Sequence, residues 1–206
     1  MAMANSREEI LSDIASSLKK NHETKPDATA GTLAAVQPAI DIDLIDEFIK
    51  NAQSASVTVR RLASVNAIAE FLNMLSPREE VHSLALAPEL QPIAQFLSGI
   101  QLCEAVDADW GLVIADAGIA ETGSVVFNSH DCPSNLLFLV EHLYVVVDAK
   151  DIYAYQEDIW RELQSELEGP FPRSIHMVTG PSRTADVEQT IQLGAHGPKS
   201  VDYLLI

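Results

Sequence analysis

The segment Ile175 to Pro198 joins an apolar stretch, a turn rich in oxygen atoms and a run of helical character, with the sequence IHMVTGPSRTADVEQTIQLGAHGP. Residues 175–178 are typical of a buried strand, and residues 186–193 are expected to form a helix. The first N–H groups of a helix lack partners within it and favour a phosphate or carboxylate. Arg183, in the turn, would hold either anion through two hydrogen bonds. We therefore predict an anion site with the ligand residues Thr179, Gly180, Ser182, Arg183, Thr184 and Asp186.

The same residues have a simpler interpretation. Thr184 or Asp186 would only cap the helix, with Gln189 three residues after Asp186 as in a capping box, and Arg183 would be solvated. The threonine, serine and glycine content of the turn favours the ligand site. Both interpretations remain open at this point.

A second turn whose side chains could bind a ligand or act in catalysis follows the apolar residues 111–115. The nine residues Asp116 to Ser124 include two carboxylates and two hydroxyls, and their glycines let the backbone approach a ligand closely. Glu121 is the candidate acid–base group, although a carboxylate here would also shape the turn by accepting backbone N–H bonds. The predicted ligand residues of this turn are Thr122, Gly123 and Ser124.

His196 is the histidine with the most suitable position for chemistry. It lies in a glycine-rich turn next to Gly197, where it would act as an acid, a base or an anion ligand with Gly197 beside it. A hydrogen-bonding strut is the alternative role. The other histidines lack the spacing that places two metal ligands on one helix face, so no metal site is predicted.

The two turns carry a family resemblance. AETGS at 120–124, and TGPSRTADVE at 179–188 followed by GAHGP at 194–198, resemble the signatures of the lactate-utilization (LUD) domain family in its C-type branch. The resemblance covers roughly residues 40–206. It implies an α/β fold with a mostly parallel sheet flanked by helices, similar to the sugar-isomerase and CoA-transferase-like superfamily.

The resemblance also implies a role. The chain would be the non-cluster subunit or accessory factor of an iron–sulfur system that oxidises L-lactate to pyruvate, with iron–sulfur subunits as partners. Its pocket would bind a small carboxylate or phosphate such as L-lactate, pyruvate or an acidic effector. The alternative is a stand-alone CoA-transferase-like or cyclo-ligase-like enzyme on a phosphorylated or CoA-linked substrate, with Glu121 as its nucleophile.

The chain departs from the family pattern between the two signatures. Members commonly carry an arginine and a Ser-Leu-Leu-Pro-like segment there, whereas residues 132–142 contain no arginine and Val140 replaces the proline. If that arginine contacts a ligand in other members, the ligand or its affinity differs here, and Asn135 would offer a neutral contact.

Cysteine usage excludes one class of cofactor. Cys103 and Cys132 are the two cysteines of the sequence, and no C-x-x-C spacing occurs. A four-cysteine iron–sulfur cluster cannot be held by this chain, so no cofactor is expected in it and the clusters are expected in partner subunits. Cys132, in a polar loop, is the better candidate nucleophile, although a lone cysteine more often serves packing.

Net charge and the distribution of apolar residues indicate which partners and which cell compartment to expect. A net charge of −17 repels nucleic acid and anionic membrane surfaces. The longest apolar run, residues 136–147, is interrupted by Glu141 and His142 and is too short for a membrane span, and the N-terminus has no signal-peptide pattern. We expect a cytoplasmic protein with no nucleic-acid partner and no membrane insertion.

Three regions are expected along the chain. Residues 1–20 would contain an amphipathic helix, residues 21–39 have the composition of a linker, and residues 40–206 form the LUD-type α/β domain. The helix would dock a partner, as in a pure scaffold, or remain a loosely held arm.

Strands and helices alternate from residue 41 onward, which indicates a mostly parallel sheet covered on both faces. Ligands of such sheets bind beyond the carboxyl ends of the strands. The turns at 116–123, 148–151 and 179–184 therefore have priority. The expected strands are 57–62, 83–87, 100–105, 111–115, 124–127, 143–147, 175–178 and 201–205, and the expected helices are 41–52, 65–75, 90–97, 134–140, 152–167 and 186–193.

Overall fold

The computed structural model describes residues 10–17, 43–75, 82–166, 172–187 and 190–206. The chain divides into two units, residues 1–38 and 39–206. In the first unit, residues 10–17 form a helix whose apolar side chains Ile10, Leu11 and Ile14 are exposed. The predicted linker at 21–39 lies outside the described residues. None of the helices in the described ranges is long and apolar enough to cross a membrane.

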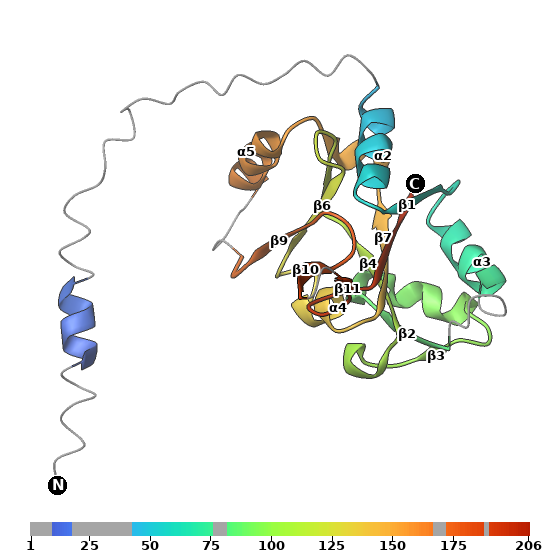
Figure 1. The fold of residues 1–206 in the computed structure, drawn as a ribbon, viewed down its shortest axis with the longest axis horizontal. Coiled ribbons are helices and arrows are strands. Elements are labelled where there is room, and N and C mark those ends of the chain that lie inside the picture. The colour runs from blue at the N-terminus through green and yellow to red at the C-terminus, as the bar shows by residue number, and fades with distance from the viewer. Residues whose placement is uncertain (1–9, 18–42, 76–81, 167–171, 188–189) are drawn as a thin grey trace, which may run out of the picture. The chain divides into compact units, whose positions relative to one another are not determined.

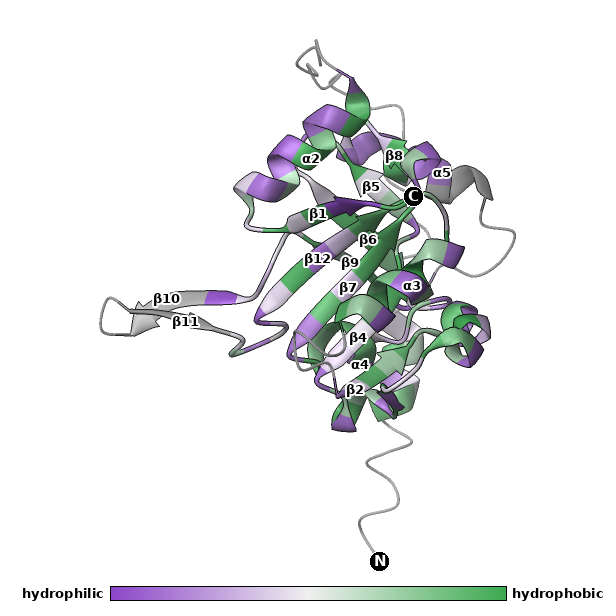
Figure 2. Ribbon diagram, turned by 90° about the vertical axis from the view of Figure 1, so that its right-hand side faces the viewer, coloured by the Kyte–Doolittle hydropathy of each residue, from purple (hydrophilic) through white to green (hydrophobic). Residues whose placement is uncertain are grey.

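The second unit is built on a six-stranded sheet in which every pair of neighbours is parallel. Its apolar strands lie at the centre of the domain in Figure 2. This arrangement, with helices on the sheet, confirms the predicted α/β class. In spatial order the strands are β1 (Thr58–Arg61), β12 (Ser200–Leu205), β7 (His142–Val147), β4 (Trp110–Ile114), β2 (Ser83–Leu86) and β3 (Gln101–Leu102).

A second sheet of four strands accompanies the first. Its strands in spatial order are β8 (Ile152–Tyr153), β5 (Ala117–Ile119), β6 (Ser124–Asn128) and β9 (Ile175–Val178). β6 is antiparallel to both β5 and β9. The predicted turn at 116–124 is therefore a hairpin of this second sheet, because the short strand β5 lies within it.

The helices cover opposite faces of the main sheet. Phe71 of α3 (Asn66–Leu75) meets Tyr144 edge-on at 5.9 Å, whereas Phe48 of α2 (Leu44–Ser54) stacks on Tyr203 at 5.6 Å. Asp202 is the register partner of Tyr144, so the next residue, Tyr203, points to the other face. α3 thus covers one face, and α2 covers the other.

Short helices and one longer helix complete the domain (Figure 1). Ile159 of α5 (Gln156–Glu166) packs with Ala117, Ile119 and Val126, which places α5 on the second sheet. The remaining helical elements are η1 (Pro88–Phe96), η2 (Ala105–Asp107), α4 (Ser134–Phe138) and η3 (Ala149–Asp151).

The predicted helix at 186–193 is wrong. The chain forms an antiparallel hairpin of β10 (Arg183–Val187) and β11 (Thr190–Leu193) in its place. Four of the residues in this segment, Thr184, Val187, Thr190 and Ile191, are branched at Cβ and favour strands. The predicted helix at 152–167 also begins later, at Gln156, because η3 and β8 occupy the residues before it.

Candidate functional site

The predicted turn at 120–124 is held by α2 and β12. Asn51 Nδ2 donates to the carbonyl oxygens of Ala120 (2.8 Å) and Glu121 (3.2 Å). Tyr203 Oη donates to the carbonyl oxygen of Gly123 at 3.2 Å. Three backbone carbonyls of the turn are therefore bound by side chains from outside it, which fixes the conformation of the turn.

The glycines of both predicted turns allow close packing on the end of α2. Gly123 has φ +66°, and a Cβ at this position would lie 2.1 Å from Ala52 N. Gly180 has φ +86°, and its Cβ would lie 2.3 Å from Ala55 O. The left-handed backbone and the missing side chain are thus both required by contacts within the protein. Binding of a ligand by these two glycines stays a prediction.

Three hydroxyls connect the two turns. Ser124 Oγ lies 2.7 Å from Thr122 Oγ1 and 2.6 Å from Thr179 Oγ1. The Ser124 side chain is buried, whereas Thr122 and Thr179 are exposed. The structure therefore brings three of the predicted ligand residues together.

Replacing Ser124 by alanine tests this connection. We expect a loss of about 1 kcal/mol in the free energy of unfolding, because two hydrogen bonds disappear while the exposed threonines regain water. Urea denaturation of the variant measures the loss. Thr122→Ser, which keeps a hydroxyl at the end of the chain of three, is the matched control and should lie within about 0.5 kcal/mol of the native protein. Equal losses in the two variants would contradict the proposed connection.

Glu121 contacts the start of α5. Its Oε1 accepts a hydrogen bond from Gln156 N at 2.8 Å, at the first residue of that helix. A carboxylate at this position satisfies an N–H group that has no partner within the helix. This geometry matches the turn-shaping interpretation of Glu121. Its chemical role stays a prediction, and the side chain remains exposed.

The predicted anion site around Arg183 lacks the helix on which it was based. Arg183, Thr184 and Asp186 lie in β10, so no helix begins here and the argument from free helical N–H groups is wrong. Ser182 N donates to Pro198 O at 2.8 Å, and this bond joins the base of the hairpin to the turn that contains Gly197. Arg183 and His196 are exposed. The structure describes the backbone of Thr184 and Asp186 but not their side chains.

Asp116 was not selected from the sequence as a site residue, although it follows a buried parallel strand. It lies where the two sheets meet: Ala115 N donates to Val146 O of β7, and Asp116 N donates to Val126 O of β6, both at 2.9 Å. Its Oδ2 accepts hydrogen bonds from Asn128 N (2.5 Å) and Asn128 Nδ2 (3.0 Å). The carboxyl group is thus held in one orientation at the carboxyl end of β4.

The surroundings of Asp116 favour its protonated form. Burial raises the pKa of Asp116 to about 6, the charges of Asp131 and Glu89 raise it as well, and the bonds from Asn128 oppose the shift. The same surroundings raise the pKa of the buried Cys132 thiol to about 12, again mainly through burial. Cys132 is therefore a thiol at neutral pH, which argues against the nucleophile role considered for it. A carboxyl group that titrates near pH 6 is suited to proton exchange.

A histidine that the sequence did not single out lies beside α4. His176 Nε2 makes hydrogen bonds with Ser134 Oγ at 2.9 Å and with Ser174 Oγ at 3.1 Å. Its ring meets Phe138 edge-on at 5.2 Å. These contacts describe a histidine that ties β9 to α4. Within the described residues, no group of histidine, cysteine and acidic side chains is arranged to hold a metal ion.

Comparison with known proteins adds family information. A model of the LUD domain matches residues 102–206. A protein of Bacillus pumilus named lactate utilization protein C is 32% identical over 110 residues, which cover 52% of this chain and 45% of that protein. A protein of the same name from Shouchella clausii is 30% identical over 101 residues, covering 48% of this chain and 44% of that protein. The chain thus spans a little under half the length of these curated relatives.

A solved structure shows the same fold. It is the crystal structure of a DUF162 family protein from Deinococcus radiodurans, which superposes with a TM-score of 0.60 at 13% sequence identity. The superposition covers 82% of this chain and 99% of that chain. At this identity the likeness concerns the arrangement of helices and strands.

Proposed function

The chain belongs to the LUD domain family, and from this premise we propose that it takes part in lactate utilization as a subunit or accessory factor without a cluster. The observation that carries the proposal is the match of residues 102–206 to the family, together with relatives named for lactate utilization. L-lactate or pyruvate is the small carboxylate that we propose as its ligand.

The proposal assigns electron transfer to partner subunits. The sequence has two cysteines, and Cys132 is buried with a raised pKa, whereas cluster ligands are thiolates. Iron–sulfur clusters would therefore reside in other proteins of the system.

Within this system we propose Asp116 as the proton-exchanging group. It is oriented by Asn128 and stands at the carboxyl end of a parallel strand, where ligands of such sheets bind. Oxidation of a hydroxy acid to a keto acid removes two electrons and two protons. In this proposal the electrons pass to the iron–sulfur clusters of the partner subunits, and the Asp116 carboxylate would accept the proton of the hydroxyl group.

Affinity purification from cells grown on L-lactate tests the proposed function. We expect proteins with iron–sulfur clusters to co-purify with the tagged chain, and the eluate to reduce a redox dye when L-lactate is added. Cells that express the tag alone are the control. A chain that purifies without such partners, together with unchanged growth on lactate when it is deleted, would contradict the proposal.

A further inference from the structure

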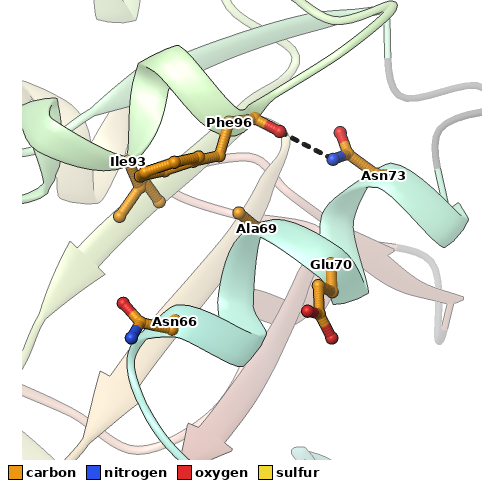
Figure 3. Close-up of a pocket in the computed structure, with 6 residues that line it drawn as sticks. All are labelled: Asn66, Ala69, Glu70, Asn73, Ile93 and Phe96. Carbon is orange, nitrogen blue, oxygen red and sulfur yellow. Dashed lines mark hydrogen bonds between the residues drawn. The ribbon is translucent and has the colours of Figure 1, made fainter.

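A cavity of about 460 Å³ lies between α3 and η1, and none of its lining residues belongs to the two predicted turns (Figure 3). Ala69 and Ile93 are buried and form its apolar part. Asn66, Glu70 and Asn73 line it from α3, and Phe96 lines it from the end of η1. This volume is within the range of pockets that bind small groups.

One side chain of α3 binds the end of η1 at the edge of the cavity. Asn73 Nδ2 donates to Phe96 O at 2.8 Å, and Asn73 Oδ1 accepts from Ser98 N at 2.8 Å. Both halves of this amide therefore fix the end of η1 against α3. The walls are in place before anything binds, which reduces the entropic cost of binding.

The lining combines the solvent-exposed aromatic ring of Phe96 with the carboxylate of Glu70. The Phe96 side chain is 62% exposed, although an aromatic ring gains stability from being covered. Glu70 is exposed, and no salt bridge among the described residues includes it. Among the residues that the structure describes, no lysine or arginine lines the cavity. Its electrostatics therefore favour a cation.

We propose that this cavity is a docking site for an arginine side chain of a partner protein. A guanidinium group stacks on an aromatic ring and is attracted by negative charge, so its chemistry suits the Phe96 ring of the lining. The Glu70 carboxylate points away from that ring in Figure 3 and adds negative charge to the lining. The domain uses such a contact elsewhere, since the Arg60 guanidinium lies 5.4 Å from the centre of the Phe71 ring.

Two further observations favour a protein over a free cation. Met74, next to Asn73, is 63% exposed and offers apolar surface to residues that flank an arginine in a chain. The net charge of −17 attracts basic segments over a long range. This inference rests on the cavity and does not depend on the proposed role in lactate utilization.

The site is tested by adding small probes to the isotope-labelled full chain and recording NMR spectra at each addition. The probes are N-acetyl-arginine amide, its neutral isostere N-acetyl-citrulline amide, and an acetylated leucine–arginine–leucine peptide amide. We expect the arginine amide to shift the backbone resonances of residues 66–73 and 93–96. Citrulline should bind at least about threefold more weakly because it lacks the charge, and the peptide should bind more tightly because its leucines contact Met74.

Variants assign the binding to the lining residues. Glu70→Gln and Phe96→Ala should each weaken arginine binding about threefold or more, whereas Gln95→Ala, an exposed change beside the cavity, should leave it unchanged. Equal binding of citrulline would overturn the proposal in favour of a neutral ligand. A peptide no tighter than the amide would overturn it in favour of a free guanidinium compound, and the absence of shifts would overturn it outright.

Discussion

Gly123→Ala is expected to lower the free energy of unfolding by about 3 kcal/mol, because the substitution adds backbone strain and overpacking together. The residue has φ +66°, and the new Cβ would meet the backbone nitrogen of Ala52 at 2.1 Å. The turn resists a shift away from α2, because Asn51 of α2 and Tyr203 of β12 both bind its carbonyl oxygens. Urea denaturation, with the midpoint and slope fitted separately, measures the loss.

Gly197→Ala is the matched control from the other predicted signature. A Cβ there meets its nearest atom, Ser182 Cβ, at 3.5 Å, which is an ordinary contact. We expect a change within about 0.5 kcal/mol. Similar losses in both variants would show that the packing of Gly123 against α2 is not the cause.

Asp116→Asn is expected to stabilise the protein at pH 8. The pKa of Asp116 is about 6 in the folded chain, above its ordinary value of 3.8, so the folded state binds this proton more tightly than the unfolded state. The resulting stabilisation is complete below the ordinary pKa and is lost as the pH rises through about 6. Asparagine keeps an acceptor for Asn128 and removes the buried charge, so we expect a gain of about 1 to 2 kcal/mol at pH 8, after allowance for partial exposure.

The pH dependence distinguishes this cause from others. At pH 4 the native carboxyl is largely protonated in the folded state, and the gain should shrink toward zero. Asp46→Asn removes the same charge from an exposed position paired with Arg61, and should give no gain at either pH. A gain of equal size at pH 4 and pH 8 would contradict the assigned pKa.

The same variant separates stability from function. If Asp116 exchanges a proton during lactate oxidation, Asp116→Asn should reduce the lactate-dependent dye reduction about a hundredfold while the partner subunits still co-purify. A gain in stability with a loss of activity is typical of a functional carboxyl in an unfavourable environment. Full activity of the variant would contradict the proposed role of Asp116.

The sequence predicted the buried strands well, because their signal is local. Residues 143–147 and 201–205 are almost entirely apolar, as strands covered on both faces must be, and they became β7 and β12. The hairpin of β10 and β11 was missed because Val187 and Ile191 are four residues apart, a spacing that also fits a helix. Strand pairing settled the choice, and pairing is not a local property.

The candidate site was less accessible to prediction. The two glycine-containing turns were identified, but the contact between Ser124 and Thr179 depends on the register of β6 and β9. The raised pKa of Asp116 depends on burial and on Glu89, which reaches it from a different part of the chain. Such values follow from the assembled tertiary structure, whereas sequence spacing reports only neighbours along the chain.

The order of strands in the main sheet has a consequence for how the protein is made. β1 pairs with β12, and the register partner of Thr58 is Asp202. The ribosome synthesises Asp202 about 140 residues after Thr58. At roughly 5–20 residues per second, β1 remains without its neighbour for on the order of ten seconds. During that interval β1 has no strand beside it, and β7 has an open edge from its own synthesis until β12 follows. Such unpaired strand edges are where nascent chains pair wrongly or aggregate.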